Sequence, residues 1–73
     1  MAHVVDARGL FCPLPLIRAR QALAALARED TLVVLATDPE APIDLAALAA
    51  DVGRGFAAHR DGDAWRLELS PRP

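Results

Sequence analysis

The chain has 73 residues, of which 53% are hydrophobic and 25% are charged, and its formal net charge is −2. This length accommodates a single domain over residues 1–73, with one small core, and excludes a two-domain organisation. The chain is slightly acidic overall and gives no sign of the basic patch with which proteins bind nucleic-acid phosphates, so we expect no nucleic-acid partner. All eight basic residues are arginines, and the absence of lysine excludes Schiff-base catalysis and a phosphate-loop lysine.

The single cysteine, Cys12, restricts the class of protein further. One thiol cannot close an internal disulfide, which excludes a disulfide-stapled secreted domain and favours a reducing compartment. The first residues carry no basic n-region and no long apolar run, so they predict neither a signal peptide nor a membrane span. We therefore expect a cytoplasmic protein with no membrane association.

The first predicted element is a short strand over residues 4–7. Arg8 and Gly9 close it as a turn, since glycine adopts the backbone angles that turns require. Cys12 therefore lies just beyond the end of this predicted strand and its turn.

A helix is predicted over residues 16–28, where apolar residues recur with a helical period. Pro13 and Pro15 suit its first turn, because the amide hydrogens of a first turn have no intrahelical partner to lose. This interpretation places Cys12 near the N-cap of the helix.

A continuous apolar run at residues 31–37 predicts an interior strand. The order strand, helix, strand favours a right-handed parallel crossover, so this strand should lie beside the first or close to it. After a loop at residues 38–42, the apolar spacing over residues 45–52 predicts a second amphipathic helix. Asp44 is suited to cap this helix or to complement its positive end, and Gly53 is suited to end it.

Two further strands are predicted over residues 56–60 and 64–70, because the Asp61-Gly62-Asp63 segment between them is a strong hairpin signal. Apolar and polar residues alternate in the second of these strands, so one set should face the core. The predicted core side is formed by Trp65, Leu67 and Leu69, and the solvent side by Arg66 and Glu68. Residues 70–73 show no pattern, and we expect them to form a loose tail.

Together these elements predict an α/β (α+β) fold in the order β-α-β-α-β-β. A four-stranded mixed sheet would carry both helices on one face, as a two-layer sandwich.

Cys12 is the candidate catalytic residue. A thiol at a helix N-terminus feels the positive end of the helix dipole and the free amide hydrogens of the first turn, and both favour the thiolate. Pro13 and Pro15 would hold this turn rigid, while Leu14 between them still has a backbone N–H that can donate to the thiolate. We expect an exposed, nucleophilic sulfur, although free cysteines often serve as small buried hydrophobes.

Charged residues near the motif are candidates for two roles. Arg8, which precedes Gly9 in the turn, could stabilise the thiolate, as could Arg18 or Arg20. Arg18 and Arg20 also offer a docking surface for an acidic partner, although a solvated helix face is the simpler interpretation.

Asp38 and Asp44 bracket the loop before the second helix. A turn and an N-cap are the favoured roles for these two carboxylates, and direct binding of a partner is the alternative.

The remaining residues exclude several cysteine chemistries. A cysteine hydrolase needs a base beside the thiol, yet His3 lies near the terminus and His59 in a predicted hairpin strand. No second cysteine is present for dithiol chemistry, and no ligand spacing indicates zinc, so we expect neither a metal nor a cofactor. Sulfur exchange with the thiol or persulfide of another protein needs only one cysteine.

Four short motifs occur together in the chain: Asp6-Ala7-Arg8-Gly9-Leu10, Cys12-Pro13-Leu14-Pro15, Leu35-Ala36-Thr37-Asp38-Pro39 and Ile43-Asp44-Leu45. In this order and spacing they resemble the TusA family of small sulfur-carrier proteins, which have the SirA-like fold. The resemblance covers nearly the whole chain. It implies a two-layer α/β sandwich in which Cys12, the motif cysteine, accepts sulfane sulfur as a persulfide.

The resemblance also implies partners. Cys12 would take sulfur from a cysteine desulfurase or a rhodanese-like enzyme and pass it to an acceptor protein in tRNA thiolation, cofactor assembly or sulfur oxidation. Pyridoxal phosphate would belong to the donor, and the carrier itself is expected to be a monomer. Two positions depart from the family pattern: Leu14 replaces an acidic residue often found between the prolines, and Gln21 stands where a basic residue is common. These departures leave the identity of donor and acceptor open.

Two other functions remain open at this point. One is a regulatory or interaction module in which Cys12 is merely structural and the arginine-bearing helix end binds a partner. The other is a one-cysteine redox sensor that peroxide oxidises to a sulfenic acid.

Overall fold

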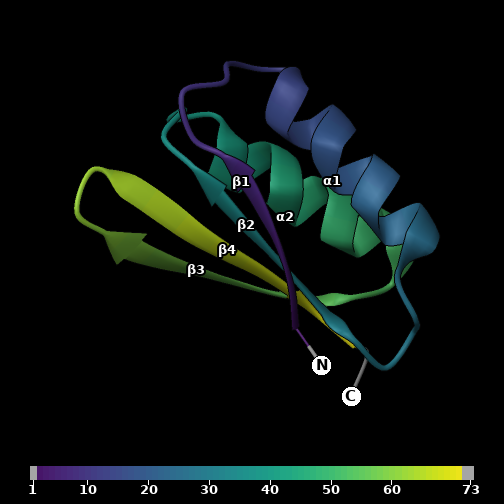
Figure 1. Ribbon diagram of the computed structural model, residues 1–73. Helices are drawn as coiled ribbons and strands as arrows, with labels where there is room; N and C mark the ends of the chain where they lie inside the picture. Colours follow the sequence, from purple (N-terminus) through teal and green to yellow (C-terminus); the bar gives the residue numbers. More distant parts are fainter. Residues whose placement is uncertain (1, 72–73) are drawn as a thin grey trace.

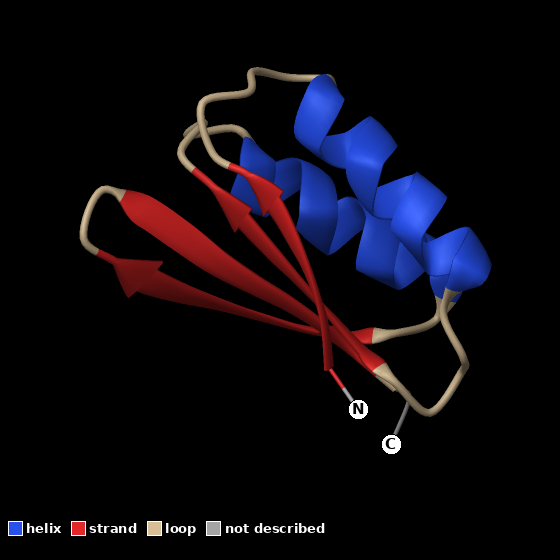
Figure 2. Ribbon diagram, viewed as in Figure 1, coloured by secondary structure: helices blue, strands red, loops and turns tan. Residues whose placement is uncertain are grey.

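A four-stranded sheet lies against two helices in the computed structural model of the chain, which describes residues 2–71 (Figure 1). The elements are β1 (Ala2–Ala7), α1 (Leu14–Ala25), β2 (Thr31–Ala36), α2 (Ala41–Val52), β3 (Gly55–Asp61) and β4 (Ala64–Ser70). Both helices cover the same face of the sheet, and the opposite face is left open (Figure 2). The predicted order of elements, the mixed sheet and the two helices on one face are confirmed.

The sheet has the strand order β1-β2-β4-β3. β1 and β2 are parallel, with Val5 opposite Val34, whereas β4 is antiparallel to both β2 and β3. The parallel pair is the one expected from the crossover through α1. Because β1 and β2 run in the same direction, the loops that follow them leave from the same edge of the sheet, and this edge carries Cys12.

The core lies between the sheet and the helices. β2 is nearly continuous in burial, as an interior strand should be, and Leu67 of β4 lies opposite Val34 within it. The fully buried residues that form this core come from both layers: Ala7, Ala19, Leu32, Val34, Ala36, Ala41, Leu45, Leu48, Ala49, Leu67 and Leu69. Trp65 is half-buried and packs against them, so the predicted inward side of β4 is confirmed.

The helices begin and end at positions that differ from the predicted ones. α1 starts at Leu14, two residues before the predicted start, and stops at Ala25, because Leu26 is already extended. α2 starts at Ala41 with Glu40 as its N-cap, so the prediction that Asp44 could cap this helix is wrong. The Asp44 amide donates to the Glu40 carbonyl at 3.0 Å, which places Asp44 inside the first turn, where its charge complements the positive helix end.

Gly53 ends α2 as predicted. Its φ of 72° lies in the left-handed region that glycine adopts without a steric penalty. At the other end of the chain, Ser70 pairs with Gly55 and is the last residue of β4, so it does not belong to the expected tail. Residues 72–73 of that tail lie outside the described residues. Within residues 2–71, neither helix is long and apolar enough to cross a lipid bilayer.

We predict that Leu67→Ala lowers the free energy of unfolding by about 2 to 5 kcal/mol, because it leaves a cavity between β4 and the helices. This is a large part of the stability of a small domain, which is typically about 5 to 15 kcal/mol. Urea denaturation followed by circular dichroism measures the change. Ile43→Ala is the control, since Ile43 is 69% exposed and its truncation should change the stability little. Equal losses for the two variants would contradict the assignment of the core.

Candidate functional site

The site lies where β1 and β2 end, and hydrogen bonds join the two loops that follow them. The Gly9 amide donates to Thr37 Oγ1 at 3.0 Å. Gly9 has a φ of 81°, so the turn uses a backbone conformation that a side chain would strain. The turn predicted at Arg8 and Gly9 is therefore confirmed, and it brings the chain back across the end of β2.

Asp38 holds the two loops together more firmly. Its side chain is only 6% exposed, and its Oδ2 accepts a hydrogen bond of 2.6 Å from the backbone amide of Cys12. Its Oδ1 accepts from the Glu40 amide at 3.0 Å, and its carbonyl accepts from the Ala41 amide at 3.0 Å. One buried carboxylate thus fixes both the approach to α1 and the start of α2. Asp38 has the turn role favoured by the sequence, and it is too buried to offer its side chain to a partner.

Cys12 is exposed and lies one residue before Pro13, the N-cap of α1. Its predicted position near the N-cap is confirmed, and so is its exposure. The peptide bond between Cys12 and Pro13 is cis. The Leu14 amide, expected to be available to the thiolate, donates instead to the Phe11 carbonyl at 2.9 Å. The first turn of the helix is therefore less open to the sulfur than the sequence suggested.

The Cys12 thiol makes one close polar contact, with Asp44. Cys12 Sγ donates to Asp44 Oδ2 at 3.2 Å, across 32 positions of sequence. This hydrogen bond raises the pKa of Cys12 above the ordinary value of a thiol, and desolvation and the negative charges of Asp44, Asp38 and Glu40 act in the same direction. In the isolated chain these carboxylates disfavour the thiolate that the helix N-terminus was expected to stabilise.

Arg8 does not support a thiolate, because it is engaged elsewhere. Its guanidinium donates to both carboxylate oxygens of Asp6, at 2.9 and 2.7 Å. The same hydrogen bonds lower the pKa of Asp6 to about 2 and raise that of Arg8. Arg18 and Arg20 lie exposed on α1 and form no ion pair with any residue in the range 2–71.

Exposed apolar side chains occur at the ends of α1 and α2 that carry Cys12 and Asp44. They have exposed fractions between 42% and 71% and form what we call the apolar rim: Phe11, Leu14, Ile17 and Ile43. Sequence reasoning named Leu14 as part of the cysteine motif but missed the other three as functional candidates, although apolar residues beside the motif were the available signal. Such a concentration of exposed apolar residues around a reactive group is typical of a surface that meets another protein.

The two histidines lie away from the thiol in the structure. His3 is part of β1, and the exposed His59 of β3 lies 3.7 Å from Glu68. Within the described part of the chain, no three histidine, cysteine or acidic side chains are grouped so that they could hold a metal ion. The chemistry of this site therefore rests on Cys12 and the carboxylates beside it.

Comparisons with known proteins agree with this geometry. The family described as "Sulfurtransferase TusA" matches residues 3–70. A protein of Neisseria meningitidis described as a candidate sulfur carrier is 43% identical over 63 residues, which cover 84% of this chain and 85% of that protein. The sulfur carrier protein TusA of Allochromatium vinosum is 45% identical over 49 residues, covering 67% of this chain and 64% of that protein.

A solved structure shows the same architecture. The crystal structure of a SirA-like protein from Desulfitobacterium hafniense covers the whole of both chains with a TM-score of 0.86 and 27% sequence identity. The sequence similarity and the shared fold extend across β1, both helices and the hairpin, and so include the loop that carries Cys12.

We predict that Asp38→Ala lowers the free energy of unfolding by about 1 to 3 kcal/mol, because the amides of Cys12 and Glu40 lose their buried acceptor. Hydrogen exchange should accelerate at these two amides more than in β2. Asp38→Asn keeps one acceptor oxygen and should lose less stability. Unchanged exchange at the Cys12 amide in the alanine variant would show that Asp38 does not fix this loop.

We predict that Asp44→Asn lowers the pKa of Cys12, because it removes the carboxylate charge beside Sγ. Iodoacetamide alkylation measured across pH should have its midpoint above the ordinary thiol value in the wild type and at lower pH in the variant. Each unit by which the pKa falls raises the thiolate fraction at neutral pH about tenfold. Asp51→Asn, the same change on the exposed side of α2, is the control and should keep the wild-type profile. A midpoint that is the same in all three proteins would contradict the Asp44 contact.

Proposed function

The chain belongs to the TusA family of sulfur carriers, and from this premise we propose that it carries sulfane sulfur as a persulfide on Cys12. The observation that carries the proposal is the exposed Cys12 sulfur at the end of a loop that is held through its backbone amide. The thiol is accessible, while the loop behind it is fixed by Asp38. This combination suits a group that must enter the active sites of other proteins without unfolding its own support.

The transfer is an exchange between two thiols and one mobile sulfur. In loading, Cys12 Sγ attacks the terminal sulfur of a donor persulfide, R–S–SH, forming a new S–S bond while the S–S bond of the donor breaks. The products are Cys12–S–SH and R–SH, and the proton of Cys12 ends on the thiolate that leaves. Unloading is the same exchange with an acceptor thiol. Neither step needs an external oxidant or reductant, because each breaks one S–S bond and forms another.

Asp44 is the natural acceptor for the proton that Cys12 loses. Its carboxylate already accepts a hydrogen bond from Sγ at 3.2 Å. The same contact favours the thiol form of the empty carrier, which alkylates and oxidises more slowly than a thiolate. We infer that a donor protein activates Cys12 by altering the surroundings of Asp44 when it docks.

The donor class that fits this chemistry is an enzyme with a cysteine persulfide, such as a cysteine desulfurase or a rhodanese-like protein, and the acceptor is a protein of a sulfur-trafficking pathway. The apolar rim supports contact with such proteins around the sulfur. Leu14, which replaces the acidic residue common in the family, belongs to this rim and is exposed. An apolar partner surface therefore suits this member of the family. tRNA thiolation, cofactor assembly and sulfur oxidation remain the candidate pathways.

The redox-sensor alternative is less well supported. Sensor cysteines are accessible thiols with a lowered pKa, because the thiolate is the species that peroxide oxidises. The pKa of Cys12 is raised by the hydrogen bond to Asp44 and by partial desolvation, so peroxide should react slowly with it.

Incubation with a cysteine desulfurase and cysteine tests the proposal. The intact mass of the protein should rise by one sulfur atom, about 32 Da, and a reductant should remove the added mass, as expected of a persulfide. Cys12→Ser should show no such adduct, and the wild type treated with peroxide instead of the donor should acquire no 32 Da adduct that the reductant removes, since a sulfinic acid of the same nominal mass is not reversed by it. A wild-type protein that stays unloaded, or a Cys12→Ser protein that gains the same mass, would refute persulfide transfer through Cys12.

A further inference from the structure

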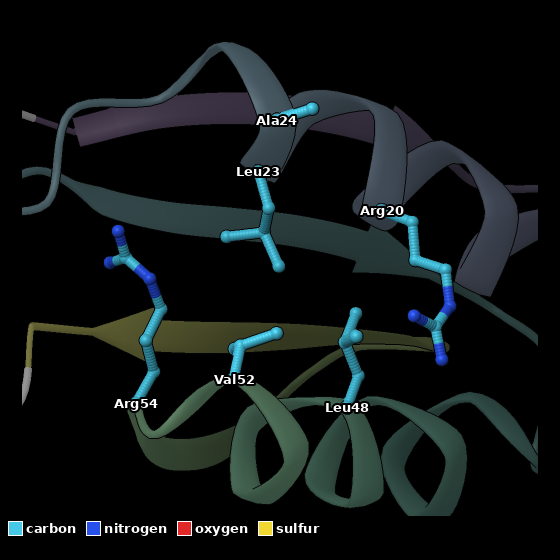
Figure 3. Close-up of a pocket in the computed structure, with 6 residues that line it drawn as sticks. All are labelled: Arg20, Leu23, Ala24, Leu48, Val52 and Arg54. Atoms are coloured by element: carbon cyan, nitrogen blue, oxygen red, sulfur yellow. The ribbon is translucent and has the colours of Figure 1, made fainter.

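A groove between α1 and α2 lies apart from the cysteine. Its volume is about 290 Å³, and it is lined by Arg20, Leu23, Ala24, Leu48, Val52 and Arg54. Figure 3 shows the apolar side chains of the two helices facing one another, with the two arginines at opposite ends of the groove. Leu48 is 2% exposed and forms the floor, whereas Ala24 and Val52 are exposed at the sides. The groove is therefore a hydrophobic channel that has a positive charge at each end.

Neither guanidinium is paired with a carboxylate among residues 2–71. Arg20 makes no ion pair with any residue in the range 2–71. The Arg54 guanidinium donates to the carbonyls of Asp30 and Ala27, at 2.7 and 3.2 Å, and these acceptors carry no formal charge. Arg28 adds a third guanidinium in a smaller adjoining pocket that shares Val52 and Arg54 with the groove. In a chain whose net charge is −2, this is a local concentration of positive charge around an apolar surface.

We propose that this groove is a second docking point of the carrier, for a segment of a partner protein that inserts an apolar side chain between acidic residues. The apolar side chain would lie over Leu48 between Leu23 and Val52. The acidic residues on either side of it would meet the guanidinium groups of Arg20 and Arg54. Charge complementarity favours an acidic segment over a neutral or basic one, because two arginines and no carboxylate line the groove.

The position of the groove favours a protein segment over a free small molecule. α1 and α2 run parallel, and Asp44, Leu48 and Val52 follow one another at every fourth position, so one stripe of α2 leads from the Cys12 contact into the groove. Arg20 is six residues beyond Leu14, about 9 Å along the helix. A partner that places its own sulfur at Cys12 can reach the groove with the adjoining part of its surface. The groove would then orient the partner without taking part in sulfur exchange.

NMR titration of the ¹⁵N-labelled protein with short blocked peptides tests this proposal. The probe is a peptide with a Leu-Phe centre flanked by two glutamates on each side, compared with peptides of the same centre flanked by glutamines or lysines. The acidic peptide should produce saturable shift changes at the amides of the groove, and added salt should weaken the binding. Arg20→Gln should weaken it roughly threefold, as expected for the loss of one exposed charge pair. Ala24→Glu, which puts a negative charge at an exposed side of the groove, should weaken it further.

Arg66→Gln removes an arginine from β4, distant from the groove, and is the control that should keep the wild-type affinity. Equal binding of all three peptides, no shifts in the groove, or binding of octanoate without binding of the acidic peptide would each overturn the proposal. Cys12→Ser should bind the acidic peptide as the wild type does. The result is thus independent of sulfur loading, and a failure here leaves the persulfide experiment intact.

Discussion

The buried Asp38 carboxylate is the interaction on which the site depends. A charged group that is only 6% exposed needs hydrogen-bond donors, and here they are the amides of Cys12 and Glu40. These two amides belong to segments that approach different helices. Satisfying one carboxylate therefore brings the N-terminal ends of α1 and α2 together, and this proximity puts Asp44 within reach of Cys12. The loops after β1 and β2 share this one buried acceptor. As a result, the pKa of the Cys12 thiol depends on Asp44, a residue of the second helix.

This arrangement separates the support of Cys12 from its reactivity. Asp38 contacts the backbone and determines where the residue lies, whereas Asp44 contacts the sulfur and determines how readily it ionises. The two acidic residues lie six positions apart but have different surroundings, since Asp38 is buried in a turn and Asp44 is half-buried in the first turn of α2. A carrier needs both properties, because a sulfur that is held in place must also stay unreactive between one partner and the next.

Much of the fold could be predicted from local patterns. Alternation identified the inward side of β4, the apolar run at residues 31–37 identified an interior strand, and Gly53 marked the end of a helix. These features depend on residues that are neighbours in sequence. The Cys12 to Asp44 contact spans 32 positions and depends on how two helices pack, so no local pattern contained it. The expectation of a stabilised thiolate rested on the helix dipole alone. The carboxylates near the sulfur, which raise the pKa of Cys12, become visible only once the second helix is in place.

The role of Arg8 shows a different kind of error. Asp6 lies near the end of β1 and Arg8 in the turn that follows it, and the Asp6 side chain accepts a hydrogen bond from the Arg8 amide at 3.1 Å, as aspartate commonly does from the residue two positions on. Their ion pair was therefore open to prediction from sequence. Arg8 was considered instead as a free charge for the thiol because it precedes the motif. A charged residue near a site in sequence has to be checked first against its immediate neighbours of opposite charge.

The backbone hydrogen bond of Cys12 has a consequence for how a loaded carrier is recognised. Asp38 accepts a hydrogen bond from the Cys12 amide and not from the Cys12 side chain. An added sulfur lengthens that side chain by an S–S bond of about 2.0 Å and therefore leaves the backbone hydrogen bond unchanged. The full and empty forms of the protein should therefore have nearly the same shape. A partner that distinguishes them has two local differences to sense: the extra atom itself, and the Asp44 carboxylate, which loses the hydrogen bond from Sγ because the inner sulfur of a persulfide carries no proton.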